Sequence, residues 1–276
     1  MQLTLGYSPC PNDTFIFDAL VHGRVEVEGV RFRERLEDVE TLNRLARESA
    51  LDLTKISYGA IPYLLDDYVL LRSGGALGRR CGPLVVAREP MPVEALRGKR
   101  IAIPGRFTTA NLLLRLFDPA LAEGVELVYS DVMPAVARGE VDAGLIIHES
   151  RFTYPEHGLV CLQDLGEWWE GETGLPIPLG GILARRSLGT DTARRVEEGI
   201  RRSVEHAFAH PGDALPYMRA HAQEMEESVM RSHVELYVNR FSRDLGKEGE
   251  RAVRTLFERG RAAGVLPAAE RPLFVA

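Results

Sequence analysis

The chain has 276 residues, of which 45% are hydrophobic and 27% charged, a composition typical of globular proteins with a sizeable core. Its 34 basic and 40 acidic residues give a net charge of -6, and no run of lysine or arginine forms a stripe suited to nucleic acid. These features argue against a disordered chain, a fibrous chain and a nucleic-acid partner.

The N-terminal residues and the later apolar runs carry no pattern of a targeting or membrane segment. Residues 1–7 (MQLTLGY) lack a basic stretch followed by a long apolar run. No later segment reaches the roughly 18 apolar residues that a membrane span needs. We therefore expect a cytoplasmic protein with no membrane partner.

Three cysteines, Cys10, Cys81 and Cys161, lie far apart and form no CxxC pair. Their odd number and spacing argue against a disulfide framework and against a thiolate metal site. Cys10 could act as a nucleophile, although an unpaired cysteine is more often a small buried thiol.

Short apolar runs alternate with helical patterns over the first two thirds of the chain. The alternation opens with runs 3–7, 14–21 and 30–36, and a helix carrying Leu42 and Ala46 follows Asp38. Further apolar runs occupy residues 53–58, 69–72, 83–87, 100–103, 125–129 and 143–147. This rhythm is typical of largely parallel sheets with helices on their faces, so we predict an α/β fold.

The last third is predominantly helical after an apolar run at residues 180–184. One amphipathic stripe consists of Val196, Ile200, Val204, Ala207 and Phe208. We predict a second helix from Pro211, a third over residues 229–241 and a fourth around residues 252–256.

Two loop-rich segments, residues 73–82 and 171–181, look like crossings between lobes, because each leads into an apolar strand. We predict a large discontinuous lobe made of residues 1–87 and 181–276. Residues 88–180 would form a smaller inserted lobe of a plausible domain size. Such an architecture is typical of hinged proteins that bind a ligand in a cleft between lobes.

Two candidate binding segments follow early strands, since ligands of parallel sheets gather at the carboxyl ends of strands. In the first, SPCPNDTFIF from Ser8, either Asn12 or Asp13 can cap the following helix, and the turn could cradle a ligand or be only a rigid connection. The second is Lys55-Ile56-Ser57. Its ammonium or hydroxyl could meet a ligand carboxylate, with a solvated lysine as the alternative.

Two further segments follow later strands. At Thr108-Thr109-Ala110 a helix begins, and its hydroxyls and free N–H groups suit a carboxylate or a ribose hydroxyl, or serve only as a cap. An apolar strand delivers His148 and Glu149 to its carboxyl end. A histidine there can act as a general base near neutral pH, although structural and surface histidines are more common.

Metal and nucleotide sites lack their usual motifs in this sequence. His206 and His210 lie four residues apart, but neither a third ligand nor an HExxH pattern accompanies them. No GxGxxG, Walker or GxSxG motif occurs. We expect no metal and no nucleotide.

Four stretches together carry a resemblance to a known family. They are SPCPNDTFIF (8–17), LEDVETLN (36–43), RSGGALG (72–78) and GLIIHESRFTY (144–154). With them the sequence resembles the 1,4-dihydroxy-6-naphthoate synthase family of the futalosine route to menaquinone, over nearly the whole chain. The resemblance implies a two-lobed fold like that of type II periplasmic binding proteins. It also implies a lyase that converts cyclic dehypoxanthine futalosine to 1,4-dihydroxy-6-naphthoate without a cofactor or metal.

The resemblance also suggests roles for individual residues. His148 matches the family's proposed catalytic base, and Lys55, Ile56 and Ser57, with Thr109 and Ala110, match its substrate-contacting segments. Further candidates are Ser8, Asn12, Asp13 and Thr108. On this interpretation a neutral His148 removes a proton from the sugar-derived part of a small carboxylate substrate, and the cleavage that follows ends in an aromatic ring.

Two other functions stay open from the sequence. One is a protein that binds a small anion without chemistry, because fold alone does not determine function. The other is a chorismate dehydratase of the same pathway. The sequence does not indicate the oligomeric state.

Overall fold

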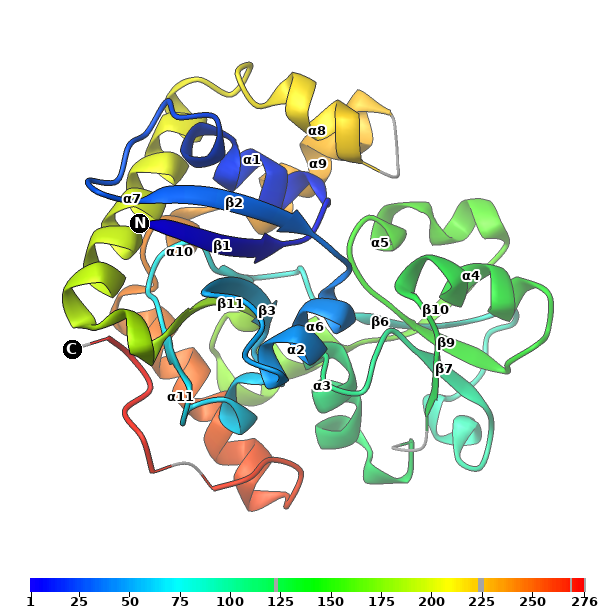
Figure 1. Cartoon of the computed structure of the whole chain (residues 1–276). Coiled ribbons are helices and arrows are strands. Elements are labelled where there is room, and N and C mark those ends of the chain that lie inside the picture. The colour runs from blue at the N-terminus through cyan, green and yellow to red at the C-terminus, as the bar shows by residue number, and fades with distance from the viewer. Residues whose placement is uncertain (122–123, 223–225, 269, 276) are drawn as a thin grey trace.

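The structure is a computed structural model that describes residues 1–121, 124–222, 226–268 and 270–275. Two β-sheets lie side by side, each with helices packed against it, and the chain passes from one to the other and back (Figure 1). The predicted α/β class is therefore confirmed.

A six-stranded sheet holds both the start of the chain and its return from the second sheet. Its strand order is β2-β1-β3-β11-β4, and β5 pairs with β11 beyond this path. The strands are β1 (Gln2–Tyr7), β2 (Arg31–Leu36), β3 (Leu53–Ser57), β4 (Tyr68–Leu70), β5 (Ala76–Gly78) and β11 (Ile177–Arg185). Strands β1, β2 and β3 pair in parallel, whereas β11 is antiparallel to β3, β4 and β5.

A five-stranded sheet with the order β10-β6-β9-β7-β8 forms the second layer. Its strands are β6 (Leu84–Ala87), β7 (Ile101–Ile103), β8 (Gly124–Glu126), β9 (Ala143–Ile146) and β10 (Val160–Asp164). Strand β7 is parallel to β8 and β9, and β6 is antiparallel to β9 and β10. Each antiparallel pair of the described strands contains β6 or β11, the strand with which the chain enters a sheet after a crossing.

The helical character of the last third is confirmed, with differences at the element ends. The helices are α1 (Pro11–Val21), α2 (Val39–Arg47), α3 (Thr109–Phe117), α4 (Tyr129–Ala137), α5 (Ser150–Thr153), α6 (Leu165–Thr173), α7 (Thr190–Ala209), α8 (Leu215–His221), α9 (Glu227–Tyr237), α10 (Arg240–Arg243) and α11 (Gly246–Ala262). The helix expected from Pro211 begins at Leu215. The helix expected over residues 229–241 ends at Tyr237, because Asn239 forms a capping box that starts α10.

Strand pairing places both crossings differently from the predicted lobe boundaries of 1–87, 88–180 and 181–276. Strand β6 (Leu84–Ala87), expected in the large lobe, pairs in the five-stranded sheet. Strand β11 begins at Ile177, within the range expected for the inserted lobe, but pairs in the six-stranded sheet. The first boundary leaves all of β6 in the other lobe and the second falls inside β11, because a short apolar run does not reveal which sheet it joins.

The first crossing touches the start of α6 (Leu165–Thr173), where Gly82 meets Gly166. A Cβ built on Gly82 would lie 2.3 Å from both the Cα and the backbone N of Gly166, so no side chain fits between them. We expect Gly82→Ala to lower the free energy of unfolding by about 1–3 kcal/mol, since backbone atoms would have to move. Chemical denaturation measures the change.

Gly171→Ala is the matched control for this prediction. Gly171 is an exposed residue inside α6, and a Cβ there would meet nothing within 4 Å. Alanine favours a helix by up to about 1 kcal/mol over glycine, so this variant should be at least as stable as the wild type. Equal stability of both variants would show that the contact at Gly82 tolerates a methyl group.

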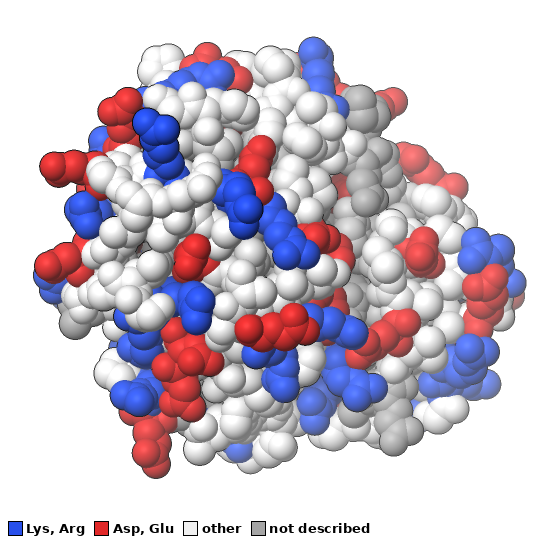
Figure 2. Space-filling view, in the orientation of Figure 1, with Lys and Arg blue, Asp and Glu red and all other residues white. Residues whose placement is uncertain are grey.

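Charges of both signs are interspersed over the surface seen in Figure 2, with no large area of one sign. That face offers no basic stripe of the kind that tracks a nucleic-acid backbone. In the described part of the chain, no helix combines the length and apolar character needed to cross a membrane.

Candidate active site

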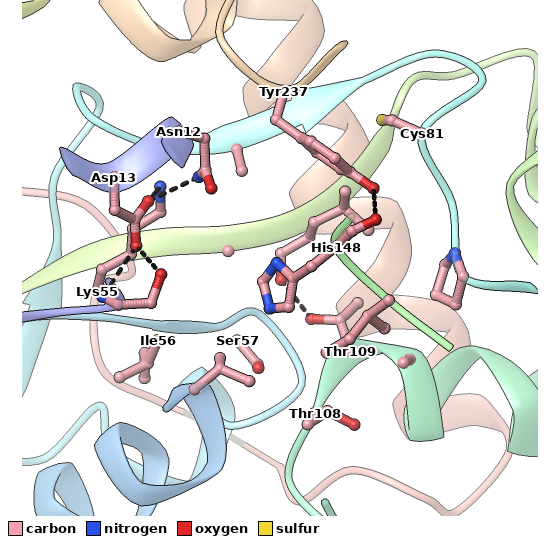
Figure 3. Close-up of a pocket in the computed structure, with 18 of the residues that line it drawn as sticks. Asn12, Asp13, Lys55, Ile56, Ser57, Cys81, Thr108, Thr109, His148 and Tyr237 are labelled. Carbon is pink, nitrogen blue, oxygen red and sulfur yellow. Dashed lines mark hydrogen bonds and ion pairs between the residues drawn. The ribbon is translucent and has the colours of Figure 1, made fainter. Parts of the chain in front are cut away.

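A pocket lies between the two sheets, with about 690 Å³ of empty space that is partly open to solvent. Its walls come from the ends of β1 and β3 in one sheet and from the segments after β7 and β9 in the other (Figure 3). All the residues proposed from the sequence line it: Ser8, Asn12, Asp13, Lys55, Ile56, Ser57, Thr108, Thr109, Ala110 and His148. The predicted cleft between lobes is therefore present.

Asp13 is the centre of a buried polar network at one end of the pocket. Its carboxylate accepts hydrogen bonds from the Ser8 backbone N–H (3.1 Å), the Ser8 hydroxyl (2.7 Å) and the Asn12 amide (2.7 Å). The expected capping role of Asn12 or Asp13 is wrong, because α1 begins at Pro11 and its N-cap is Cys10. Asp13 instead pairs with Lys55 of β3, and the Asn12 carbonyl oxygen lies 2.9 Å from His233 of α9.

Lys55 points from β3 into this network, and its ammonium forms a buried ion pair with Asp13. The side chains of Lys55 and Asp13 are only 7% and 4% exposed, which overturns the alternative of a solvated lysine. An ammonium has three donors, so Lys55 keeps donors for a ligand after pairing with Asp13.

Ser57 presents a polar group on the same strand, two residues after Lys55. Asn43 from α2 forms two hydrogen bonds with Ser57. The Ser57 backbone N–H donates to the Asn43 carbonyl (2.9 Å), and the Asn43 amide donates to the Ser57 hydroxyl (3.2 Å). Within the described residues the hydroxyl hydrogen of Ser57 has no acceptor, so it can be donated to a ligand.

Helix α3 starts at the opposite wall, and its two threonine hydroxyls are already engaged. Thr108 caps the helix, accepting from Asn111 (3.2 Å) and donating to Gly105 (2.8 Å). Thr109 donates to the Leu179 carbonyl of β11 (2.6 Å) and accepts from the Gly59 N–H (3.1 Å), which ties the two lobes together. In the described structure the backbone N–H groups of Thr109 and Ala110 have no acceptor, so they can bind an anion at the positive end of the helix.

His148 follows β9 with a φ of 57°, in the left-handed region that residues other than glycine rarely occupy. This turn lets its ring project into the pocket (Figure 3). The Tyr129 ring lies edge-on at 5.1 Å and the His233 ring lies nearly parallel at 6.1 Å. Burial lowers the pKa of His148 below its usual 6.5, which keeps the imidazole neutral and able to accept a proton near pH 7.

Tyr237 and Cys81 also line the pocket and were not among the site residues predicted from the sequence. Tyr237 lies on α9, where its hydroxyl is 3.5 Å from the His148 carbonyl, and Cys81 belongs to the first crossing. His233 and Tyr237 are four residues apart, so they lie on the same face of α9. This spacing was the only signal in the sequence that could have placed both side chains near one site.

Behind His148 lies a second layer of buried polar groups: Cys10, Tyr129, Glu149 and His233. Donor atoms of Cys10, His148 and Glu149 lie within 4.8 Å of one another. Burial raises the pKa of the Cys10 thiol well above its ordinary value, so the thiol stays protonated and is a poor metal ligand and nucleophile. The absence of a metal stays a prediction.

Comparison with known proteins shows the family. A model described as menaquinone biosynthesis matches residues 3–262, and the chain belongs to this family. The protein named 1,4-dihydroxy-6-naphthoate synthase from Thermus thermophilus is 60% identical over 273 residues, 99% of each chain. The protein of the same name from Streptomyces coelicolor is 48% identical over 272 residues, 96% of this chain and 95% of its own.

Solved structures agree on the fold. A protein from Archaeoglobus fulgidus has a TM-score of 0.91 at 35% identity and covers 96% of this chain and 98% of its own. A Candida albicans protein described as having the generic periplasmic binding protein fold has a TM-score of 0.71 at 14% identity, covering 98% and 92%. The expected periplasmic-binding-protein-like fold is therefore confirmed.

Proposed function

From membership of that family and from the pocket, we propose that this enzyme is a carbon–carbon lyase. It converts cyclic dehypoxanthine futalosine to 1,4-dihydroxy-6-naphthoate, with His148 as the general base. The observation that carries the proposal is the neutral imidazole of His148 in a pocket lined by hydroxyl, ammonium and helix N-terminal groups. The near full-length likeness to two proteins named for this product supports it.

The substrate carboxylate binds at the start of α3. The unpaired N–H groups of Thr109 and Ala110 lie at the positive end of a nine-residue helix, which favours a negative group. Lys55 is a weaker candidate for this carboxylate than the sequence suggested, because Asp13 already balances its charge. Ser57 and the remaining donors of Lys55 bind the hydroxyl groups of the sugar-derived part.

His148 then removes a proton from the sugar-derived part of the substrate. The proton comes from a hydroxyl of that part, and the electron pair of the O–H bond forms a carbonyl as the adjacent carbon–carbon bond breaks. The sugar-derived fragment leaves as this carbonyl compound, and the electron pair of the broken carbon–carbon bond stays on the bicyclic product, which takes up a proton as it becomes aromatic. The apolar walls of the pocket, including Ile56 and Leu179, exclude water from the intermediate. A general base in such a site contributes about 10²- to 10⁴-fold to the rate.

Contacts between the lobes would hold the cleft closed over the substrate. The Phe107 N–H lies 3.3 Å from the Glu40 carboxylate, and Arg44 pairs with Glu126 across the same edge. A cleft that opens to admit a ligand must break these contacts. X-ray scattering with and without substrate measures this motion, and identical profiles would exclude it.

Incubating the wild-type enzyme with cyclic dehypoxanthine futalosine and, separately, with chorismate tests the proposed activity. We expect 1,4-dihydroxy-6-naphthoate from the first substrate and no consumption of the second. Consumption of chorismate would indicate a dehydratase, and binding of either compound without turnover would indicate a binding protein. The expected cytoplasmic location stays a prediction.

The dependence of kcat/KM on pH reports the proton on His148. Because burial lowers the pKa of His148, activity should persist as the pH falls through 6.5 and be lost only below it. Circular dichroism at each pH controls for unfolding. An acid limb centred above 6.5 would contradict a neutral, buried base.

A further inference from the structure

Two buried side-chain atoms behind His148 face each other without any hydrogen-bond partner. They are Oε2 of Glu149 and Nδ1 of His233, which lie 3.6 Å apart. The His233 side chain is 0% exposed and that of Glu149 is 7% exposed, so water does not satisfy these atoms freely. A buried polar atom without a partner destabilises the fold, so this arrangement needs an explanation.

The tautomer of His233 follows from the hydrogen bonds around it. The Asn12 amide group donates to Asp13, so its carbonyl oxygen faces His233 and must accept the proton carried by His233 Nε2, 2.9 Å away. Burial lowers the pKa of His233 well below its ordinary value, so the ring carries only this one proton. Nδ1 of His233 is therefore a lone-pair acceptor.

If Glu149 were ionised, its Oε2 would face the lone pair of His233 Nδ1, and the two would repel each other. The other oxygen of Glu149, Oε1, accepts from the Tyr129 hydroxyl at 3.3 Å. Among the described residues, no ion pair joins Glu149 to a lysine or arginine that could balance a negative charge on it. The titratable groups around it are Cys10, Tyr129, His148, His233 and Tyr237.

We propose that Glu149 is a carboxylic acid whose proton is shared with His233, and that this pair positions His148 for the reaction. One proton on Oε2 of Glu149 satisfies both orphaned atoms once the 3.6 Å between them shortens by about 0.4–0.9 Å to hydrogen-bond distance. The positioning role rests on the proposed function of His148, whereas the protonation state does not.

The pair acts on His148 through packing and through charge. The His233 ring is nearly parallel to the His148 ring, and Tyr129, which donates to Glu149, lies edge-on to the same ring. A negative Glu149 would raise the pKa of His148 and oppose the effect of burial. The neutral pair therefore holds the ring in place and leaves it unprotonated.

Infrared difference spectroscopy of the free protein tests the protonation state without any substrate. Wild type minus Glu149→Gln at pH 7 should show the C=O stretching band of a protonated carboxylic acid, shifted in D₂O. Absence of that band would overturn the proposal in favour of an ionised Glu149. This result does not depend on which reaction the enzyme catalyses.

Glu149→Gln is also the matched control for activity, because glutamine is a neutral copy of the protonated acid. Its carbonyl can accept from Tyr129 and its amide can donate to His233, so kcat and the acid limb of the pH profile should stay within about threefold of the wild type. Glu149→Ala and His233→Ala each lose the bond and should lower kcat by about 10- to 100-fold with little change in KM, through misplacement of His148.

Three outcomes would contradict the positioning role. Glu149→Gln could lose as much activity as Glu149→Ala, or its acid limb could move to lower pH, which would reveal a missing negative charge. Glu149→Ala could also be as active as the wild type. If the wild type itself fails to turn over the substrate, the infrared measurement still tests the shared proton, and failure of the proposed function is recognised separately.

Discussion

Replacing His148 by alanine should lower kcat by about 10²- to 10⁴-fold while KM changes little, because the variant loses the group that accepts the substrate proton. The loss should be chemical and not structural. Alanine keeps the Cβ and the left-handed backbone at this position, where φ is 57°. Steady-state kinetics gives both constants, and thermal unfolding shows whether the variant is folded.

Two controls separate a missing base from a general disturbance of the site. His157 is an exposed histidine of the same segment and lies outside the pocket, so His157→Ala should keep wild-type activity. Added imidazole can enter the space left by His148→Ala and should restore part of kcat at pH values where it is unprotonated. Equal kcat for the wild type and His148→Ala would keep the lyase and discard this histidine as its base.

Breaking the Asp13–Lys55 pair should cause a large loss of stability. Asp13→Asn leaves the buried ammonium of Lys55 without a counter-charge, and we expect the free energy of unfolding to fall by about 3–5 kcal/mol. Lys55→Met should cost less, because Ser8 and Asn12 still donate three hydrogen bonds to Asp13. Urea denaturation measures both changes.

A double-mutant cycle gives the energy of the interaction itself. Combining Asp13→Asn with Lys55→Met should cost less than the sum of the single changes, with a coupling of about 0.5–3 kcal/mol. Glu140→Gln is the surface control, since its pair with Arg138 is exposed by 56% and 59% and should leave the free energy of unfolding close to that of the wild type. Additive effects at Asp13 and Lys55 would show that the two charges do not stabilise each other.

Local sequence patterns predicted the presence of helices and strands more accurately than they predicted which sheet each strand joins. The alternation of apolar runs indicated the α/β class and the helical last third. Each helix or strand that buries one face shows its own periodicity of apolar residues, whatever its partners are. Sheet membership depends on partners far away in sequence. The apolar run Leu84–Ala87 is compatible with either sheet, and only its pairing with β9 and β10 places it in the five-stranded sheet.

The predicted site residues were found because each one lies at or just beyond the carboxyl end of a strand. Ser8, Lys55, Thr108 and His148 come from separate segments, and the topology brings their strand ends to one cleft. Their bonding could not be predicted in the same way. The pairing of Lys55 with Asp13 and the use of the Thr109 hydroxyl by Leu179 depend on distances that only the folded chain defines.

The groups behind the pocket wall were beyond sequence reasoning for a related reason. His233 lies on a helix more than eighty residues after His148, and its spacing to Tyr237 is equally typical of a structural helix face. Its contact with Asn12 joins positions 221 residues apart. No local pattern reports such a contact.

A crystal structure of His148→Ala with cyclic dehypoxanthine futalosine bound is the most direct test of the proposed site. We predict that the carboxylate accepts hydrogen bonds from the N–H groups of Thr109 and Ala110, and that the sugar-derived part faces position 148. A substrate bound outside the cleft, or one whose sugar-derived part points away from position 148, would contradict the proposed site and the role of His148 in it.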